Sequence, residues 1–194
     1  MKKVLVFLAE GFEEIEALSP VDYLRRAGLE VVCAATATSS RNVKGAHGIT
    51  VLADILLDSY LASLSEENLP DAVVVPGGMP GAANIAECRS ALSLIDSMVE
   101  NNKIVAAICA APALVLSKTK ALFCKEWTCY PQMENEASAK KFAQNHKSGI
   151  PFVCDGNLLT GRGPGAAEQF SMKLVELLCG SETAEKIKAA SVQR

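Results

Sequence analysis

The sequence lacks several patterns that would indicate a nucleic-acid, membrane or metal partner. Its formal net charge is −3 at pH 7 and it contains no long run of basic residues, so neither nucleic acid nor an anionic membrane surface is an expected partner. Only two histidines are present, and a histidine-rich metal site is therefore not expected. No stretch approaches the roughly 20 apolar residues that a membrane span requires.

Disulfide and zinc-ligand spacings are also missing. The seven cysteines form an odd number, and no two of them have the C-x-x-C spacing. Neither a disulfide framework nor a zinc site is expected from this pattern, and we expect reduced thiols, a cytoplasmic location and no metal. The apolar N-terminal run stops at Glu10 without a cleavage site, so we interpret it as a first strand and not as a signal peptide.

Apolar strand-like segments alternate with helix-like segments along the whole chain. This alternation predicts an α/β fold with a mostly parallel sheet between two layers of helices. A chain of 194 residues suits one domain, expected to span residues 1–194. The expected strands are 3–8, 29–35, 49–52, 72–75, 104–108 and a hairpin of 152–154 with 158–160. The expected helices are 13–27, 91–101, 110–117, 166–179 and 182–190.

Cys109 stands where the apolar segment 104–108 runs directly into a predicted helix. In a nucleophile elbow, such a turn holds a nucleophilic side chain out at the carboxyl end of a sheet. Because a helix N-terminus favours a thiolate, we expect the pKa of Cys109 to lie below its usual value of about 8.5. A buried structural cysteine is the alternative interpretation.

The loop after the first strand contains Glu13, Glu14 and Glu16. Glu16 begins an apolar helix, where a partly desolvated carboxyl would have a raised pKa and could donate a proton to a thiolate. Favourable charge at a helix N-terminus is a sufficient explanation for Glu13 and Glu14. The same explanation stays open for Glu16.

Two glycine-containing loops follow strands. Gly77 and Gly78 allow backbone N–H groups to approach a ligand closely, and with the N–H of Ala110 they could stabilise an oxyanion formed by attack of Cys109. A plain tight turn is the alternative. The segment 161–165 partly matches a dinucleotide fingerprint, but Pro164 interrupts it, so no nucleotide cofactor is expected.

Four segments, taken together and in order, resemble the ThiJ/PfpI superfamily, in the branch of the parkinsonism-associated protein deglycase and its bacterial relatives. They are AEGFEEIE at 9–16, PGG at 76–78, AAICAAP at 106–112 and LTGRGPG at 159–165. The resemblance implies a flavodoxin-like three-layer sandwich, one class I glutamine amidotransferase-like domain, and a homodimer. It also implies that Cys109 is the reactive cysteine, that Glu16 is its protonated partner, and that Gly78 and Ala110 are backbone donors.

The resemblance implies two kinds of function. One is a cysteine-dependent, glutathione-independent glyoxalase or protein deglycase, which acts on methylglyoxal, glyoxal or glycated protein and is linked to oxidative stress. The other is a redox sensor or redox-regulated chaperone that works by oxidation of Cys109. Ala110 stands where peptidase-like members have histidine directly after the cysteine, so peptidase activity is not expected. Glutamine amidotransferase activity is not expected either, because neither His47 nor His146 lies in a His-x-Glu motif.

Several other residues are candidates for accessory roles. Tyr130 stands where the deglycase branch often has histidine, so any glyoxalase turnover is expected to be slow, and His47 stands where the family often has arginine. The accessory candidates are Tyr130, His47, Arg26, Arg162 and Pro164. The first helix, with Arg25 and Arg26, is also a candidate for the dimer interface.

The remaining cysteines have less informative surroundings. Cys33, Cys154 and Cys179 lie in apolar runs and are expected in the core. Cys124 and Cys129 lie in an irregular segment near Trp127 and are candidates for a secondary redox site.

Overall fold

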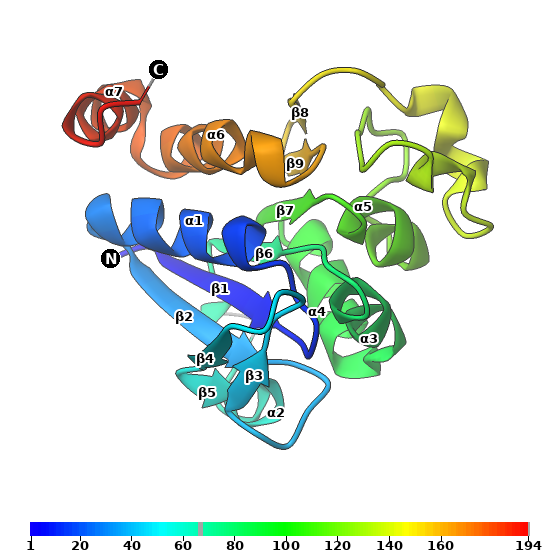
Figure 1. The fold of residues 1–194 in the computed structure, drawn as a ribbon, viewed down its shortest axis with the longest axis horizontal. Coiled ribbons are helices and arrows are strands. Elements are labelled where there is room, and N and C mark those ends of the chain that lie inside the picture. The colour runs from blue at the N-terminus through cyan, green and yellow to red at the C-terminus, as the bar shows by residue number, and fades with distance from the viewer. Residues whose placement is uncertain (66–67, 194) are drawn as a thin grey trace.

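The computed structural model describes residues 1–65 and 68–193 (Figure 1). One sheet contains β1 (Lys3–Leu8), β2 (Glu30–Ala35), β5 (Ile55–Leu56), β6 (Ala72–Val75), β7 (Ile104–Ile108), β8 (Phe152–Asp155) and β9 (Leu158–Gly161). Its strand order is β5-β2-β1-β6-β7-β9-β8. Every neighbouring pair is parallel except β8 with β9, which form an antiparallel hairpin. A small second sheet pairs β3 (Asn42–Lys44) with β4 (Thr50–Leu52).

Helices cover both faces of the large sheet. They are α1 (Glu14–Arg26), α2 (Leu57–Ala62), α3 (Gly81–Glu87), α4 (Arg89–Glu100), α5 (Ala111–Leu114), α6 (Ala167–Cys179) and α7 (Ser181–Ala190). Figure 1 shows α1, α6 and α7 on one side of the sheet and α3, α4 and α5 on the other. The predicted flavodoxin-like, three-layer α/β fold is therefore confirmed.

The core consists of two apolar clusters, one on each face of the sheet. Alternate side chains of β1 enter opposite clusters: Leu5 and Phe7 pack with the α3 and α4 layer, while Val6 and Leu8 pack with α1 and α6. This is the side-chain alternation that a strand buried on both faces requires. The near-continuous apolar sequences of β1, β6 and β7 follow from it.

The predictions that fail concern short elements. The helix predicted over 110–117 is instead α5, four residues long, followed by the 3-10 turn Leu116–Lys118. Four elements were not predicted, namely β3, β5, α2 and α3. The strand β3 has only Val43 buried, and α3 begins with Gly81-Ala82-Ala83, so neither offers the periodic apolar positions from which an element is recognised.

Candidate active site

The candidate site is built at the carboxyl ends of three neighbouring parallel strands, β1, β6 and β7. The loop after β1 leads to Glu16, the loop after β6 contains Gly77 and Gly78, and β7 ends directly before Cys109. Ligand sites of open parallel sheets lie at this edge. The topology thus brings together three segments that are far apart in the sequence.

Cys109 occupies a sharp strand-to-helix turn. Its φ of +65° is in the left-handed region, which residues with a Cβ adopt rarely and at an energetic cost. Hydrogen bonds on both sides hold this backbone: the Cys109 N–H donates to the Gly161 carbonyl at 2.9 Å, and the Tyr130 N–H donates to the Cys109 carbonyl at 2.8 Å. The turn is the nucleophile elbow that the sequence predicts.

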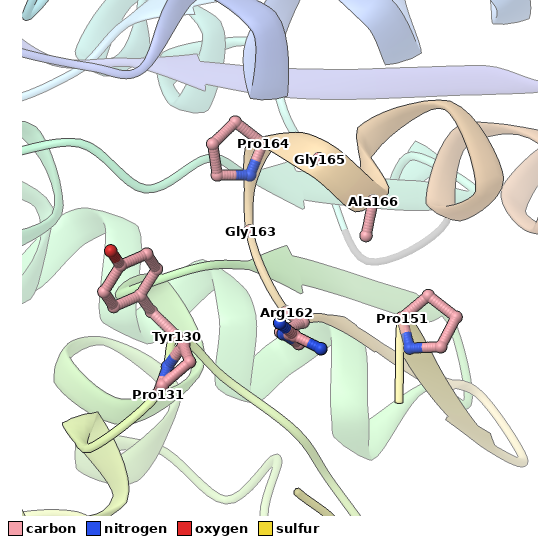
Figure 2. A pocket seen from close by; sticks show the side chains of 8 residues that line it. All are labelled: Tyr130, Pro131, Pro151, Arg162, Gly163, Pro164, Gly165 and Ala166. Atoms are coloured by element: carbon pink, nitrogen blue, oxygen red, sulfur yellow. The ribbon is translucent and has the colours of Figure 1, made fainter. Parts of the chain in front are cut away.

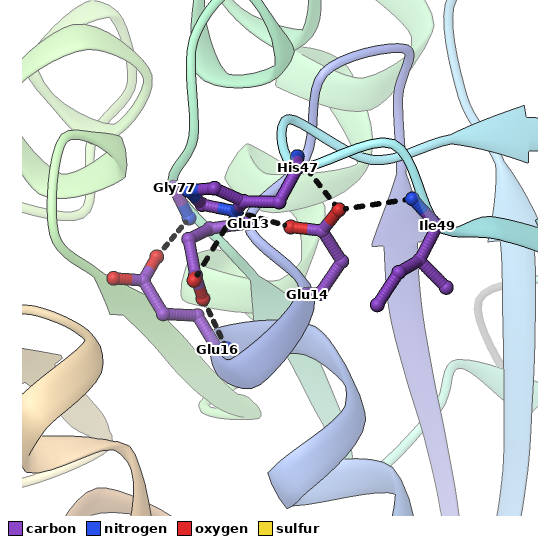
Figure 3. A network of polar contacts seen from close by, with 6 residues as sticks. All are labelled: Glu13, Glu14, Glu16, His47, Ile49 and Gly77. Atoms are coloured by element: carbon purple, nitrogen blue, oxygen red, sulfur yellow. Dashed lines mark hydrogen bonds and ion pairs between the residues drawn. The ribbon is translucent and has the colours of Figure 1, made fainter.

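Glu16 lies beside Cys109 and is fully buried. Its Oε2 accepts a hydrogen bond from the Gly77 N–H at 2.8 Å, as Figure 3 shows. Among the described residues, its Oε1 has no hydrogen-bond partner, and the Cys109 thiol lies close enough to affect the pKa of the carboxyl. Burial raises the pKa of Glu16 from 4.5 to about 7, although the Cys109 and Gly77 hydrogen bonds oppose this.

Glycine is required at two positions beside this pair. A Cβ on Gly77 would lie 2.7 Å from both Cys109 Cβ and Glu16 Oε2. Gly78 has a φ of +88°, and a Cβ there would lie 2.3 Å from the Glu13 backbone nitrogen. The two glycines therefore let this loop lie directly against the cysteine and the carboxyl.

The prediction that the pKa of Cys109 is lowered is wrong when Glu16 is ionised. Burial raises the pKa of Cys109, and the charge of Glu16 and its hydrogen bond to the thiol raise it further, while the N–H groups of Ala110 and Gly78 lower it. The helix that follows Cys109 is α5, which has four residues and is much shorter than the predicted helix 110–117. A negative charge on both groups at once is thus strongly disfavoured, and at neutral pH the pair keeps at least one proton on the thiol or the carboxyl.

A cavity of about 500 Å³ opens above Cys109. The residues that line it are Glu13, Glu14, Ile15, His47, Ile49, Gly78, Cys109, Tyr130 and Pro164. A neighbouring hollow of about 440 Å³ shares Tyr130 and Pro164 and is also lined by Arg162 (Figure 2). The accessory candidates His47, Tyr130 and Pro164 therefore lie at the cavity, and Arg162 lies beside it.

His47 is held at the cavity wall by Glu14, whose role sequence reasoning missed (Figure 3). The ring Nδ1 of His47 lies 2.7 Å from Glu14 Oε2, and Glu14 Oε1 accepts the backbone N–H of His47 at 2.8 Å. The hydrogen bond to Glu14 raises the pKa of His47. The two residues are 33 positions apart, so no local spacing signals the pair. Glu13 has a different role: it is the N-cap residue of α1, and its side chain accepts the Glu16 N–H at 2.7 Å. This agrees with the predicted helix-terminal role of Glu13.

Arg26 is not brought to the site. It lies at the opposite end of α1 from Glu14, about 18 Å away at 1.5 Å per helical residue, and pairs with Asp22 at 2.6 Å. Within this chain Arg26 does not reach the cavity that Glu14 lines, because α1 starts at the cavity and runs away from it.

The other cysteines follow the predictions only in part. Cys33 is buried as predicted, but Cys154 and Cys179 are only half-buried. Cys154 lies on β8, at the edge of the sheet, and Cys179 is the last residue of α6. At an edge or an end, these side chains pack against the core but are not enclosed by it. All seven cysteines are free thiols.

Comparison with known proteins gives consistent matches. The DJ-1/PfpI family model matches residues 2–177. Protein DJ-1 homolog A of Arabidopsis thaliana is 36% identical over 98% of this chain and 46% of its own length. The glutathione-independent glyoxalase DJR-1.2 of Caenorhabditis elegans is 30% identical over 93% of this chain and 91% of its own. The structure of oxidized Toxoplasma gondii DJ-1 has 34% identity and a TM-score of 0.88, covering 99% of this chain and 98% of that one.

The chain belongs to the DJ-1/PfpI family, as the resemblance in its sequence implied. It spans about half the length of the two Arabidopsis thaliana relatives, 46% and 42%. Among the residues that the structure describes, no helix has the length and apolar character needed to cross a membrane.

Proposed function

We propose that the protein is a cysteine-dependent, glutathione-independent glyoxalase that converts methylglyoxal to lactate and glyoxal to glycolate. The observation that carries the proposal is the fully buried Glu16 carboxyl, with its raised pKa, beside Cys109 at an open cavity. An accessible nucleophile beside a buried proton donor is what addition to an aldehyde needs. The similarity to a relative named as a glyoxalase supports the same activity.

The first step is addition to the aldehyde. The proton shared by the pair moves to Glu16, and the Cys109 thiolate forms a C–S bond with the aldehyde carbon while the C=O π electrons move to oxygen. The backbone N–H groups of Gly78 and Ala110, which already approach the Cys109 sulfur, stabilise the resulting oxyanion. Protonation of the oxyanion by Glu16 gives a hemithioacetal and leaves Glu16 as a carboxylate.

The second step moves a proton between the two carbons. The Glu16 carboxylate removes the proton of the former aldehyde carbon to form an enediol, and the neighbouring carbon is then protonated. The product at this stage is a 2-hydroxyacyl thioester of Cys109. Water hydrolyses the thioester, releases the hydroxy acid and returns the thiol, so that one water is consumed and no external oxidant or reductant is needed.

His47 is the second group that could carry protons at the cavity. Its Nδ1 is engaged by Glu14, and no described residue hydrogen-bonds to Nε2. A histidine held by a buried carboxylate in this way is oriented for proton transfer. We propose that His47 exchanges protons between the cavity and solvent, whereas Glu16 acts at the reacting atoms.

The direct test is lactate formation from methylglyoxal by purified protein without glutathione. Turnover that disappears in a folded Cys109→Ala variant is expected. Absence of turnover in the wild-type protein would overturn the proposal. The same attack on a glycated protein side chain is the deglycase form of this activity, and release of unmodified protein from a methylglyoxal adduct tests it separately.

A redox-sensing role is the second candidate. Cys109 borders an open cavity, and the N–H groups of Gly78 and Ala110 with the Glu16 proton could bind the oxygens of an oxidised sulfur. A structure of the oxidized Toxoplasma gondii relative exists. We expect dilute peroxide to oxidise Cys109 before the other six cysteines, and peptide mass mapping tests this. Oxidation at Cys124 or Cys88 with Cys109 intact would rule out the sensor role.

Three broader features belong to the same proposal. Residues 1–194 form one domain and the protein is a homodimer, as the family resemblance implies, and it is cytoplasmic. Seven free thiols suit a reducing compartment. Light scattering that gives the 20.5 kDa mass of one chain at micromolar concentration would contradict the homodimer.

A further inference from the structure

A second cluster of chemically reactive side chains lies outside the lining of the Cys109 cavity. Cys129, Glu134 and His146 each bring one potential ligand atom to within 4.8 Å of the others. Cys129 Sγ is 3.6 Å from His146 Nε2 and 4.0 Å from Glu134 Oε2. Sulfur and nitrogen ligands of tetrahedral zinc are separated by about 3.5 Å, given Zn–S near 2.3 Å and Zn–N near 2.0 Å. The three atoms thus already stand close to the spacing of a coordination sphere.

The backbone holds His146 in place for this role. Residues Trp127 and His146 form an isolated parallel bridge, with the Lys147 N–H donating to the Trp127 carbonyl at 2.8 Å. The His146 ring packs edge-on against Trp127, with ring centroids 4.9 Å apart. Trp127 is fully buried. The imidazole is therefore fixed by the core and needs little rearrangement to serve as a ligand.

Glu134 adds a carboxylate ligand to the cluster. It lies in the 3-10 turn Met133–Asn135 and is half-buried. Within residues 1–65 and 68–193, no lysine or arginine forms an ion pair with it, and its side chain accepts a long hydrogen bond from the Cys129 thiol, which also lies 3.3 Å from the Tyr130 carbonyl. The carboxylate is therefore not engaged by another cation and can serve as a metal ligand.

We propose that Cys129, Glu134 and His146 bind a divalent transition-metal ion, with Zn²⁺ the best match and water or an exogenous ligand in the fourth position. Thiolate and imidazole ligands suit zinc, and a carboxylate oxygen completes a common ligand set. Cys129 is buried, but Glu134 and His146 are half-exposed, so the ion can enter from their side. Binding converts the Cys129 thiol to a thiolate, so one proton is released for each ion bound.

This site would stabilise the loop that forms part of the Cys109 cavity. Tyr130 follows Cys129 directly, lines the cavity, and donates its N–H to the Cys109 carbonyl. A metal that joins Cys129 to His146 closes the segment between them and restrains Tyr130. We therefore expect Zn²⁺ to raise the thermal unfolding temperature of the protein.

Cobalt substitution tests the site directly, because a thiolate ligand produces a near-ultraviolet charge-transfer band. Metal-free Cys109→Ala protein, which lacks the other candidate thiolate, is titrated with Co²⁺ and then with Zn²⁺. A band that saturates at one Co²⁺ per chain and is displaced by Zn²⁺ is expected. It should disappear in Cys129→Ser but persist in Cys124→Ser, a matched change in the same segment.

Two further variants keep the test valid if Cys129→Ser fails to fold. Glu134→Gln and His146→Asn should retain the native circular dichroism spectrum, bind Co²⁺ at least about tenfold more weakly and lose the zinc-dependent rise in unfolding temperature. No band at any Co²⁺ concentration up to millimolar would overturn the proposal. So would a band that survives in folded Cys129→Ser, or unchanged affinity in both ligand variants.

Discussion

Cys109 and Cys129 form an instructive pair within one molecule. Cys109 is half-buried and Cys129 is buried, and each thiol lies next to one glutamate. Burial raises the pKa of both, that of Cys129 to about 12. The difference lies in the carboxyl. Glu16 is fully buried, so its own pKa rises to about 7 and it can hold a proton at Cys109. Glu134 is half-buried near His146, which gives Cys129 a ligand set instead of a proton donor. The burial of the carboxyl decides which chemistry a Cys–Glu pair supports.

The largest expected effect separates the two cysteines. Cys109→Ser should lower the rate of lactate formation from methylglyoxal by at least about 10³-fold, because the bond-forming atom is lost. Cys129→Ser should keep kcat within about threefold when the protein is folded, because this thiol is not among the residues that line the cavity. Equal losses in both variants would show that the two thiols are not functionally distinct.

Substitutions of Glu16 and Glu134 should likewise differ in their effect on kcat. Glu16→Gln should reduce kcat by about 10²–10³-fold, since positioned acid–base groups contribute this much and an amide cannot transfer a proton. Glu134→Gln is the matched control, with an expected change of less than about twofold. A Glu16→Gln enzyme with wild-type kcat would remove Glu16 from the mechanism.

The titration of Glu16 should also make stability depend on pH. Because its pKa is raised from 4.5 to about 7, the folded state binds this proton more tightly than the unfolded state. The resulting stabilisation is fully present below about pH 4.5 and is lost as the pH rises through about 7, a change of roughly 3 kcal/mol.

Urea unfolding at several pH values measures this change. Glu16→Gln has no carboxyl to titrate, so the difference in unfolding free energy between wild type and variant should fall across this range. Glu134→Gln should follow the wild-type pH profile. A constant difference between wild type and Glu16→Gln would contradict the raised pKa.

The smallest expected effect concerns Tyr130, which lines the cavity and has an exposed fraction of 50%. Tyrosine, with a pKa near 10, is a poor base at neutral pH. Tyr130→His should raise kcat for methylglyoxal by up to about tenfold, because it adds a further base beside Glu16. Tyr130→Phe should change kcat little. If Tyr130→His folds and has unchanged kcat, a missing histidine is not what slows the reaction.

The sequence predicted the fold well where elements are long and their apolar pattern is regular. The strands β1, β6 and β7 are continuous apolar runs, so both their bounds and the elbow after β7 could be predicted. The short α2 and α3 could not, because their burial depends on packing against α4 and the sheet and not on their own periodicity.

The site could be predicted only in part. Glu16 was recognised from its apolar surroundings and from the family resemblance. The Glu14–His47 pair was missed, because two residues 33 positions apart meet only after the chain folds back at Gly45. The Cys129 cluster was missed for the same reason, since its ligand spacings of 5 and 17 positions match no compact metal motif. The raised pKa of Cys109 also needed the structure, because it depends on burial and on the distance to a second charge.

The most direct test of the central claim is infrared spectroscopy of the Glu16 carboxyl as a function of pH. The C=O stretch of a protonated carboxyl is assigned to Glu16 by its absence in Glu16→Gln. We predict that this band is fully present at pH 5.5 and disappears with a midpoint near pH 7. A band already lost by pH 5.5, as for an ordinary carboxyl with a pKa near 4.5, would show that Glu16 is not a protonated partner of Cys109 near neutral pH.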